Sequence, residues 1–252
     1  MSSIITGKNI VKIFNESKEQ FRALNKVNIE LTKGEFVAIM GPSGSGKSTL
    51  LFALSGMDKI TDGSVKFNDL ELSELSEKAL ADVRRMKMGF VFQQPTMLKN
   101  LNLLDNIILP AFHKGQKNTE IITQKAKALM KKTGIADLED REITEVSGGQ
   151  LQRAGICRAL MNTPEIIFAD EPTGALNSRS AEEILSLLVD INKEGTAILL
   201  VTHDAKVAAR ADRVLFTKDG RIVSELPLQK YSRRNLEARG ERVLAMMNEV
   251  GI

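Results

Sequence analysis

Short runs of consecutive apolar residues alternate with longer amphipathic segments along this chain of 252 residues. Four of the runs are apolar on both faces, as strands buried on both sides of a parallel sheet are. They cover Phe36–Met40, Met88–Phe92, Ile166–Ala169 and Ala197–Thr202. Strands of this kind separated by helical segments predict an α/β fold with a largely parallel sheet.

Three further regions depart from this pattern. Apolar and polar positions alternate over Ile4–Phe14 and Ala23–Leu31, which predicts an antiparallel pair of strands at the edge. Between about 94 and 146 the chain shows Lys-rich helical periodicity without a strand-like run, and we expect an inserted helical subdomain there. The overall division expected is one domain over residues 4–233 and a helical C-terminal appendage over 234–252.

Composition narrows the class of protein. Lys and Arg number 35 and Asp and Glu 32, and the resulting net charge of +3 is too small for a dedicated nucleic-acid binder. No apolar run exceeds five residues, so no membrane-spanning helix is expected. The start of the chain lacks the pattern of a secretion signal, and the single cysteine, Cys157, fits a reducing compartment. We therefore expect a soluble, cytoplasmic globular protein.

A phosphate-binding loop follows the first of the four apolar runs. Residues 41–48 match the pattern G-x-x-x-x-G-K-[ST] between a strand and a helix. Glycines allow backbone N–H groups to face phosphate oxygens, Lys47 would reach the β- and γ-phosphates, and the Ser48 hydroxyl would bind Mg²⁺. The alternative is a Gly/Ser-rich turn without a ligand. The expected nucleotide-binding residues are Gly41, Ser43, Gly44, Gly46, Lys47, Ser48 and Thr49.

An acidic pair closes a later strand. The apolar run Ile166–Ala169 is followed directly by Asp170 and Glu171. Beside a phosphate-binding loop, a carboxylate delivered by a strand holds Mg²⁺, and Asp170 fits that role. Glu171 lies one residue further, where it could orient or deprotonate the attacking water. Without the loop, such a pair would be read as a solvated turn.

The motif Ser147-Gly148-Gly149-Gln150 completes a series that identifies a family resemblance. In order, the phosphate-binding loop, this motif, Asp170-Glu171 and His203 closely resemble the nucleotide-binding subunit of ATP-binding-cassette (ABC) transporters. The resemblance covers about residues 4–225. It implies a P-loop NTPase with a RecA-like core, an antiparallel β subdomain and an inserted helical subdomain.

The resemblance also implies a dimer. In the family, the Ser147–Gln150 motif of one subunit closes over ATP held by the other, so two ATP molecules lie between the subunits. The motif stands at the start of a predicted helix, where the serine hydroxyl and the unpaired backbone N–H groups can bind an anion. An ordinary helix cap, with Ser147 and Gln150 forming a capping box, is the competing interpretation.

Three further site residues follow from the family pattern. Gln93 matches the glutamine that senses Mg²⁺ and the attacking water, and the segment after it contacts the membrane partner; the adjacent Gln94 is chemically equal. His203 matches the histidine that contacts the γ-phosphate, although a lone histidine is more often structural. Phe14 sits where the family places an aromatic residue against adenine, and a core phenylalanine is the alternative.

One position departs from the family pattern. Asn177 stands where the family usually has an aspartate, which removes a charge but keeps hydrogen-bonding reach. We expect an effect on coupling across the dimer or on the hydrolysis rate, and none on binding.

The expected function is that of an ATPase which, with ATP and Mg²⁺, drives a polytopic permease from the cytoplasmic face of the membrane. Segments of the sequence such as Leu104–Pro110 resemble those of the branch that contains lipoprotein-release, macrolide-export and bacitracin-type peptide-resistance ATPases. A regulatory ATPase that controls signalling or a cell-wall hydrolase is the alternative. A soluble ABC ATPase acting on DNA or ribosomes would have two cassettes or coiled-coil insertions, which this sequence lacks.

Overall fold

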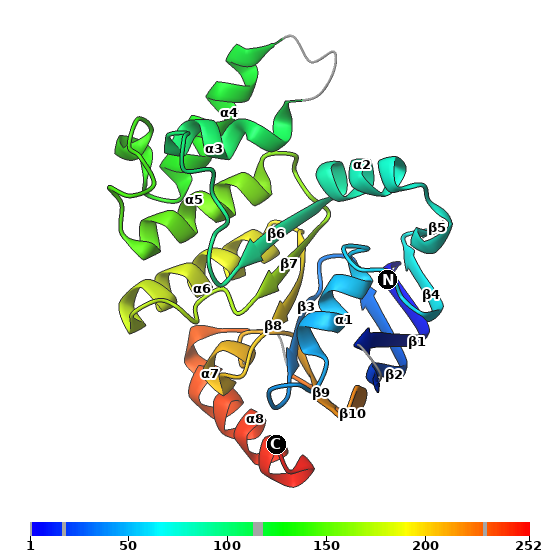
Figure 1. The fold of residues 1–252 in the computed structure, drawn as a ribbon. Coiled ribbons are helices and arrows are strands. Elements are labelled where there is room, and N and C mark those ends of the chain that lie inside the picture. Colours follow the sequence, from blue (N-terminus) through cyan, green and yellow to red (C-terminus); the bar gives the residue numbers. More distant parts are fainter. Residues whose placement is uncertain (1, 17–18, 113–117, 229–230) are drawn as a thin grey trace.

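Two β-sheets flanked by helices make up the computed structural model, which describes residues 2–16, 19–112, 118–228 and 231–252 (Figure 1). The larger sheet has the strand order β10-β9-β3-β8-β7-β6, in which β10 is antiparallel to β9 and the other neighbours are parallel. Its strands are β3 (Phe36–Met40), β6 (Met88–Phe92), β7 (Ile166–Asp170), β8 (Ala197–Val201), β9 (Arg213–Lys218) and β10 (Arg221–Pro227).

The predicted parallel core is confirmed, since the four apolar runs form β3, β6, β7 and β8 with ends that differ by at most one residue. The β9–β10 hairpin was not predicted. Its two strands are joined by Asp219 and Gly220, which have φ angles of 49° and 71°. An Asp-Gly pair with two positive φ angles is the usual two-residue hairpin turn, so the local signal was present in the sequence.

The smaller sheet is wholly antiparallel, with the order β2-β1-β4-β5. The predicted pair is present as β1 (Ser3–Glu16) and β2 (Glu19–Thr32), but it does not lie at the edge of the parallel sheet. It forms a separate sheet with β4 (Asp62–Phe67) and β5 (Leu70–Glu71), which is the antiparallel β subdomain that the family resemblance implies. Its apolar side chains pack against the parallel sheet, and this buries them better than extending the sheet edge would.

Helices cover both faces of the parallel sheet, with α1 on one face and α6, α7 and α8 on the other (Figure 1). No helix within the described ranges is long and apolar enough to cross a bilayer. The helices are α1 (Lys47–Leu54), α2 (Glu77–Lys87), α3 (Leu103–Ile108), α4 (Thr119–Lys132), α5 (Gly148–Leu160), α6 (Ser178–Lys193), α7 (Ala205–Ala208) and α8 (Leu236–Val250), with 3₁₀ turns at Leu72–Glu74, Leu109–Ala111, Ala136–Leu138 and Arg233–Asn235.

The region expected as a helical subdomain contains α3 and α4, and residues 113–117 within it lie outside the described part. These helices share a buried apolar cluster with Ala154 and Cys157 of α5 and with Met161, which directly follows that helix. The packed helical unit therefore draws on residues beyond 146. The domain boundaries themselves stay a prediction.

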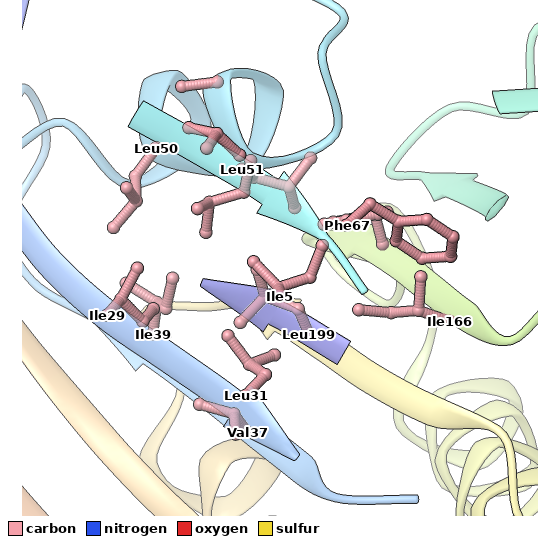
Figure 2. Close-up of a cluster of buried hydrophobic side chains, with 14 of the residues drawn as sticks. Ile5, Ile29, Leu31, Val37, Ile39, Leu50, Leu51, Phe67, Ile166 and Leu199 are labelled. Atoms are coloured by element: carbon pink, nitrogen blue, oxygen red, sulfur yellow. The ribbon is translucent and has the colours of Figure 1, made fainter. Parts of the chain in front are cut away.

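Successive residues of the central strands point into two different cores. On one face Val37, Ile39 and Leu199 meet α1 and the antiparallel sheet, as Figure 2 shows. On the other face Ala38 and Leu200 meet α6, α7 and α8. Because the central strands are buried on both faces, they provide a rigid base for the loops that follow their carboxyl ends.

The C-terminal helix α8 is fixed at both ends. The buried Arg239 donates from Nε to the carbonyl oxygen of Ala209 at 2.6 Å and from Nη2 to that of Ala211. At the other end Lys218 of β9 donates to the carbonyl oxygens of Val250 and Gly251 at 3.3 and 3.2 Å. Helix α8 therefore packs against the core.

Candidate functional site

The phosphate-binding loop leaves β3 and enters α1, as its sequence pattern predicts. Gly41 opens the loop where a Cβ atom would lie 2.2 Å from the carbonyl oxygen of Thr217, so no larger residue fits. Thr217 of β9 also holds the loop in place through two hydrogen bonds. Its hydroxyl donates to the Met40 carbonyl at 3.1 Å and accepts from Ser45 at 2.9 Å. The buried Ser45 hydroxyl thus faces β9, away from any ligand.

Lys47 begins α1 and folds its side chain back over the loop. Its Nζ donates to the carbonyl oxygens of Gly41 and Pro42 at 2.9 and 2.8 Å. Burial lowers the pKa of the Lys47 ammonium, and the negative charges of Glu171 and Asp170 oppose that effect. The ammonium is therefore held between loop carbonyls and two carboxylates, at a place suited to a phosphate.

Ser48 and Asp170 meet although they are far apart in the sequence. The Ser48 hydroxyl donates to Oδ1 of Asp170 at 3.0 Å, because β7 ends beside the start of α1. Burial raises the pKa of the Asp170 carboxyl group, and the Ser48 hydrogen bond opposes the rise. A hydroxyl beside a partly desolvated carboxylate is a donor set that suits Mg²⁺, so Ser48 and Asp170 fit the ion, whereas the role predicted for Gln93 toward the metal stays a prediction.

Glu171 and His203 form a second pair at the same edge of the sheet. Nδ1 of His203 lies 2.8 Å from Oε1 of Glu171. The Glu171 backbone has a φ of 46°, an unusual left-handed conformation for a residue with a side chain, and its N–H donates to the carbonyl oxygen of Val201. Backbone strain of this kind concentrates at functional sites.

A cavity of about 510 Å³ is bordered by most of these groups, but Asp170 is not among the residues that line it. All seven predicted residues of the phosphate-binding loop line it, together with Glu171 and His203. Pro42 of the same loop also lines it, as do Phe21, Ala23 and Val201, which were not predicted from the sequence. Phe21 is 57% exposed and gives the cavity an aromatic wall; an exposed aromatic residue on a strand next to the loop was the available signal.

Phe14, expected to meet adenine, is the cross-strand partner of Phe21 and is 36% exposed. The Nζ atom of Lys12 lies 4.7 Å from the centroid of its ring. Phe14 is not among the residues that line the cavity. It is therefore not a core residue, and its role toward adenine stays a prediction.

Gln93 follows β6 and lies next to the segment after Glu171. A Cβ atom on Gly174 would come within 2.9 Å of Nε2 of Gln93, so the amide packs against the Gly174 backbone. Gln93 does not line the cavity. Asn177, at the end of that segment, accepts a hydrogen bond from the Ser180 N–H at 2.9 Å and caps α6.

The predicted second anion site lies at the start of α5. The Ser147 hydroxyl accepts from the Gln150 N–H at 3.3 Å, and Oε1 of Gln150 accepts from the Ser147 N–H at 2.8 Å. The capping box considered from the sequence is therefore present. Ser147, Gly148, Gly149 and Gln150 are absent from the lining of the cavity described above. The structure thus does not bring this motif to the loop of its own chain.

Comparison with known proteins places the chain in a family. A match to the ABC transporter family spans residues 24–174. The macrolide export ATP-binding/permease protein MacB of Mannheimia succiniciproducens is 42% identical over 92% of this chain, but the chain spans only 36% of that protein. The bacitracin export ATP-binding protein BceA of Halalkalibacterium halodurans is 41% identical over 92% of both chains.

A solved structure agrees with these matches. The ATP-binding cassette MJ0796 of Methanocaldococcus jannaschii, a dimer in a post-hydrolysis state with ADP and Pi, superposes with a TM-score of 0.84. It is 38% identical and covers 90% of this chain and 100% of its own. The predicted P-loop NTPase fold is confirmed. The chain belongs to the ABC transporter family, as an ATP-binding cassette with ATPase activity.

Proposed function

We propose that ATP binds in the 510 Å³ cavity with its phosphates on the loop of residues 41–46 and beside Lys47. Ser48 and Asp170 would hold the Mg²⁺ ion, which supplies positive charge to the phosphate oxygens. Phe14 and Phe21 would flank the adenosine. Two observations support these roles: Lys47 Nζ folds back onto the carbonyl oxygen of Gly41 in the loop, and the Ser48 hydroxyl donates to Asp170 at 3.0 Å.

Glu171 is proposed to orient or deprotonate the attacking water. It borders the cavity with its side chain 20% exposed, and His203 orients the carboxylate from 2.8 Å. His203, whose side chain is 74% exposed, would contact the γ-phosphate, and Gln93 would sense the ion and the water. Catalysis would consist of positioning and electrostatic stabilisation.

The Ser147–Gln150 motif is proposed to act on ATP bound by a second copy of the chain. Its backbone amides lie at the N-terminus of α5, where the helix dipole favours an anion. The motif does not line the cavity of its own chain, and the relative MJ0796 is a dimer. A head-to-tail dimer would bring each motif to the other subunit's ATP.

A membrane permease is the proposed partner of this dimer. A second cavity of about 360 Å³ lies between α2, β6 and α5, close to Gln93, and its lining is mainly apolar with three arginines at its border. Met57 and the nearby Met86 are 47% and 42% exposed. Such a hollow suits a short apolar helix of a permease whose acidic residues pair with Arg84, Arg85 and Arg158.

The transport system is proposed to act in antimicrobial-peptide resistance or export at the cytoplasmic face of the membrane. The observation that carries this proposal is the 41% identity to BceA over 92% of both chains. The MacB proteins are similar in identity, but this chain spans only 36% of the MacB protein described above, so the similarity to BceA covers more of the relative. A regulatory ATPase that moves no cargo is the alternative.

Co-purification from gently solubilised native membranes tests the permease. The tagged wild-type chain is expected to recover a polytopic permease with a large extracytoplasmic domain. Ala81→Glu places a charge in the cavity from an exposed position of α2 and is expected to lose it. Ala128→Glu, the same change on the exposed face of α4, serves as the control. Recovery of the permease by all three chains would refute the docking site.

A further inference from the structure

Gln152 of α5 lies between two loops: the one that follows β6 and begins with Gln93, and the one that follows β7 and begins with Glu171. None of the functional roles proposed above involves Gln152. Its side chain is buried, with the residue 1% exposed. The pairing between β6 and β7 ends at Phe92 and Asp170, and beyond these residues the two segments of the chain separate (Figure 1). Gln93 follows on one strand and Glu171 on the other. Gln152 fills the gap between them.

Both N–H groups of the Gln152 amide bind backbone carbonyls. Nε2 donates to the carbonyl oxygen of Phe92 at 3.0 Å and to that of Pro172 at 2.8 Å. The reverse orientation of the amide would place Oε1 against two carbonyl oxygens, so the orientation is determined. One carbonyl directly precedes Gln93 and the other directly follows Glu171. A single side chain therefore fixes the spacing of the two loops.

The same loops also touch each other directly. Gly174 packs against the Gln93 amide so closely that a Cβ atom would lie 2.9 Å from Nε2. A displacement of either loop thus moves the other. Gln152 belongs to the second turn of α5, the helix whose first residues form the Ser147–Gln150 motif. Gln152 therefore connects the helix that begins with this motif to the backbone beside Glu171.

We propose that Gln152 is a positioning residue, which holds Gln93 and Glu171 in the geometry for hydrolysis and links them to the start of α5. The proposal rests on the roles proposed above for these two residues. Gln152 does not touch the nucleotide, so it affects the rate of hydrolysis and leaves ATP binding to the loop. Positioning errors near 1 Å cost about 100-fold in rate.

Two variants of Gln152 test this assignment. Gln152→Glu keeps the shape and replaces the donor nitrogen by oxygen, and Gln152→Met removes the donors without adding charge. Each is expected to lower kcat for ATP hydrolysis roughly 10- to 100-fold while KM and the Kd for ATP stay within about threefold. Gln124→Glu, an exposed position on α4, is the matched control and should match the wild type.

The possible results separate three cases. A kcat within twofold of the wild type in both Gln152 variants would overturn the proposal. A parallel loss of kcat, ATP affinity and thermal stability would also overturn it, because that pattern reports damage to the fold alone. Glu171→Gln, assayed in parallel, isolates the underlying roles: normal turnover in that variant would refute the site assignment, whatever the Gln152 variants do.

Discussion

Two glycines of the phosphate-binding loop allow the packing of that loop to be measured. Gly44 and Gly46 both have left-handed backbones, with φ of 78° and 94°. A Cβ atom at Gly44 would meet nothing within 4 Å. A Cβ atom at Gly46 would lie 2.5 Å from the carbonyl oxygen of Ala23 and 3.1 Å from Cδ2 of Leu24. Substitution by alanine thus adds the same backbone strain at both positions and a steric clash at only one.

The difference between the variants can be estimated from these distances. A left-handed alanine costs about 1–2 kcal/mol, offset by about 0.4–1 kcal/mol from the stiffer unfolded chain. Gly44→Ala should therefore lose between about 0 and 1.6 kcal/mol. Gly46→Ala must also move the loop away from β2, and overpacking of this kind costs about 1–3 kcal/mol more. We expect the two free energies of unfolding to differ by about 2 kcal/mol.

Urea unfolding without nucleotide measures this difference. Circular dichroism is the suitable signal, because the chain has no tryptophan and one tyrosine. Equal losses in the two variants, within about 0.5 kcal/mol, would refute the close approach of the loop to β2. The result bears on function, since the loop can cradle phosphates only while β2 and β9 hold it in place.

Three further predictions concern catalysis, base binding and the cysteine. Glu171→Gln should retain ATP, accumulate a dimer in light scattering and lose at least 100-fold in turnover, whereas normal turnover would exclude its role with water. Phe14→Ala and Phe21→Ala should each raise the Kd for ATP about three- to tenfold, and an unchanged Kd in the first would remove Phe14 from the site. Burial raises the pKa of the Cys157 thiol from 9.0 to about 11. Between pH 9 and 11 the thiol ionises in the unfolded chain but stays protonated in the folded one, so the folded state loses stability as the pH rises. In urea unfolding, the difference in free energy of unfolding between the wild type and Cys157→Ala should therefore shrink by up to about 3 kcal/mol over this range. An advantage independent of pH would contradict the burial of the thiol.

The sequence was sufficient for the parts of the fold that depend on local pattern. Strands buried on both faces are continuous apolar runs, so β3, β7 and β8 could be bounded almost to the residue. β4 and β10 expose alternate residues, and their pattern is weaker. Whether β1 and β2 join the parallel sheet or form their own depends on packing between distant segments, which local alternation does not encode.

The residues of the site likewise fall into two groups, those that a local motif predicts and those that depend on packing between distant segments. The phosphate-binding loop is contiguous, so its residues could be named from spacing alone. Phe21 and Gln152 have no motif of their own, and they gain their positions from the pairing of β1 with β2 and from the packing of α5 beside β6. The contact of Thr217 with Ser45 likewise requires the parallel pairing of β9 with β3, which brings together residues 172 positions apart.

The central claim is that ATP hydrolysis by this chain drives a membrane permease. Its most direct test is the rate of ATP turnover by the purified chain alone and by its complex with the captured permease in a lipid bilayer. We expect faster turnover in the complex, loss of turnover in Glu171→Gln, and no stimulation of Ala81→Glu by the permease. Equal rates with and without the permease, or a chain that binds no permease, would contradict it.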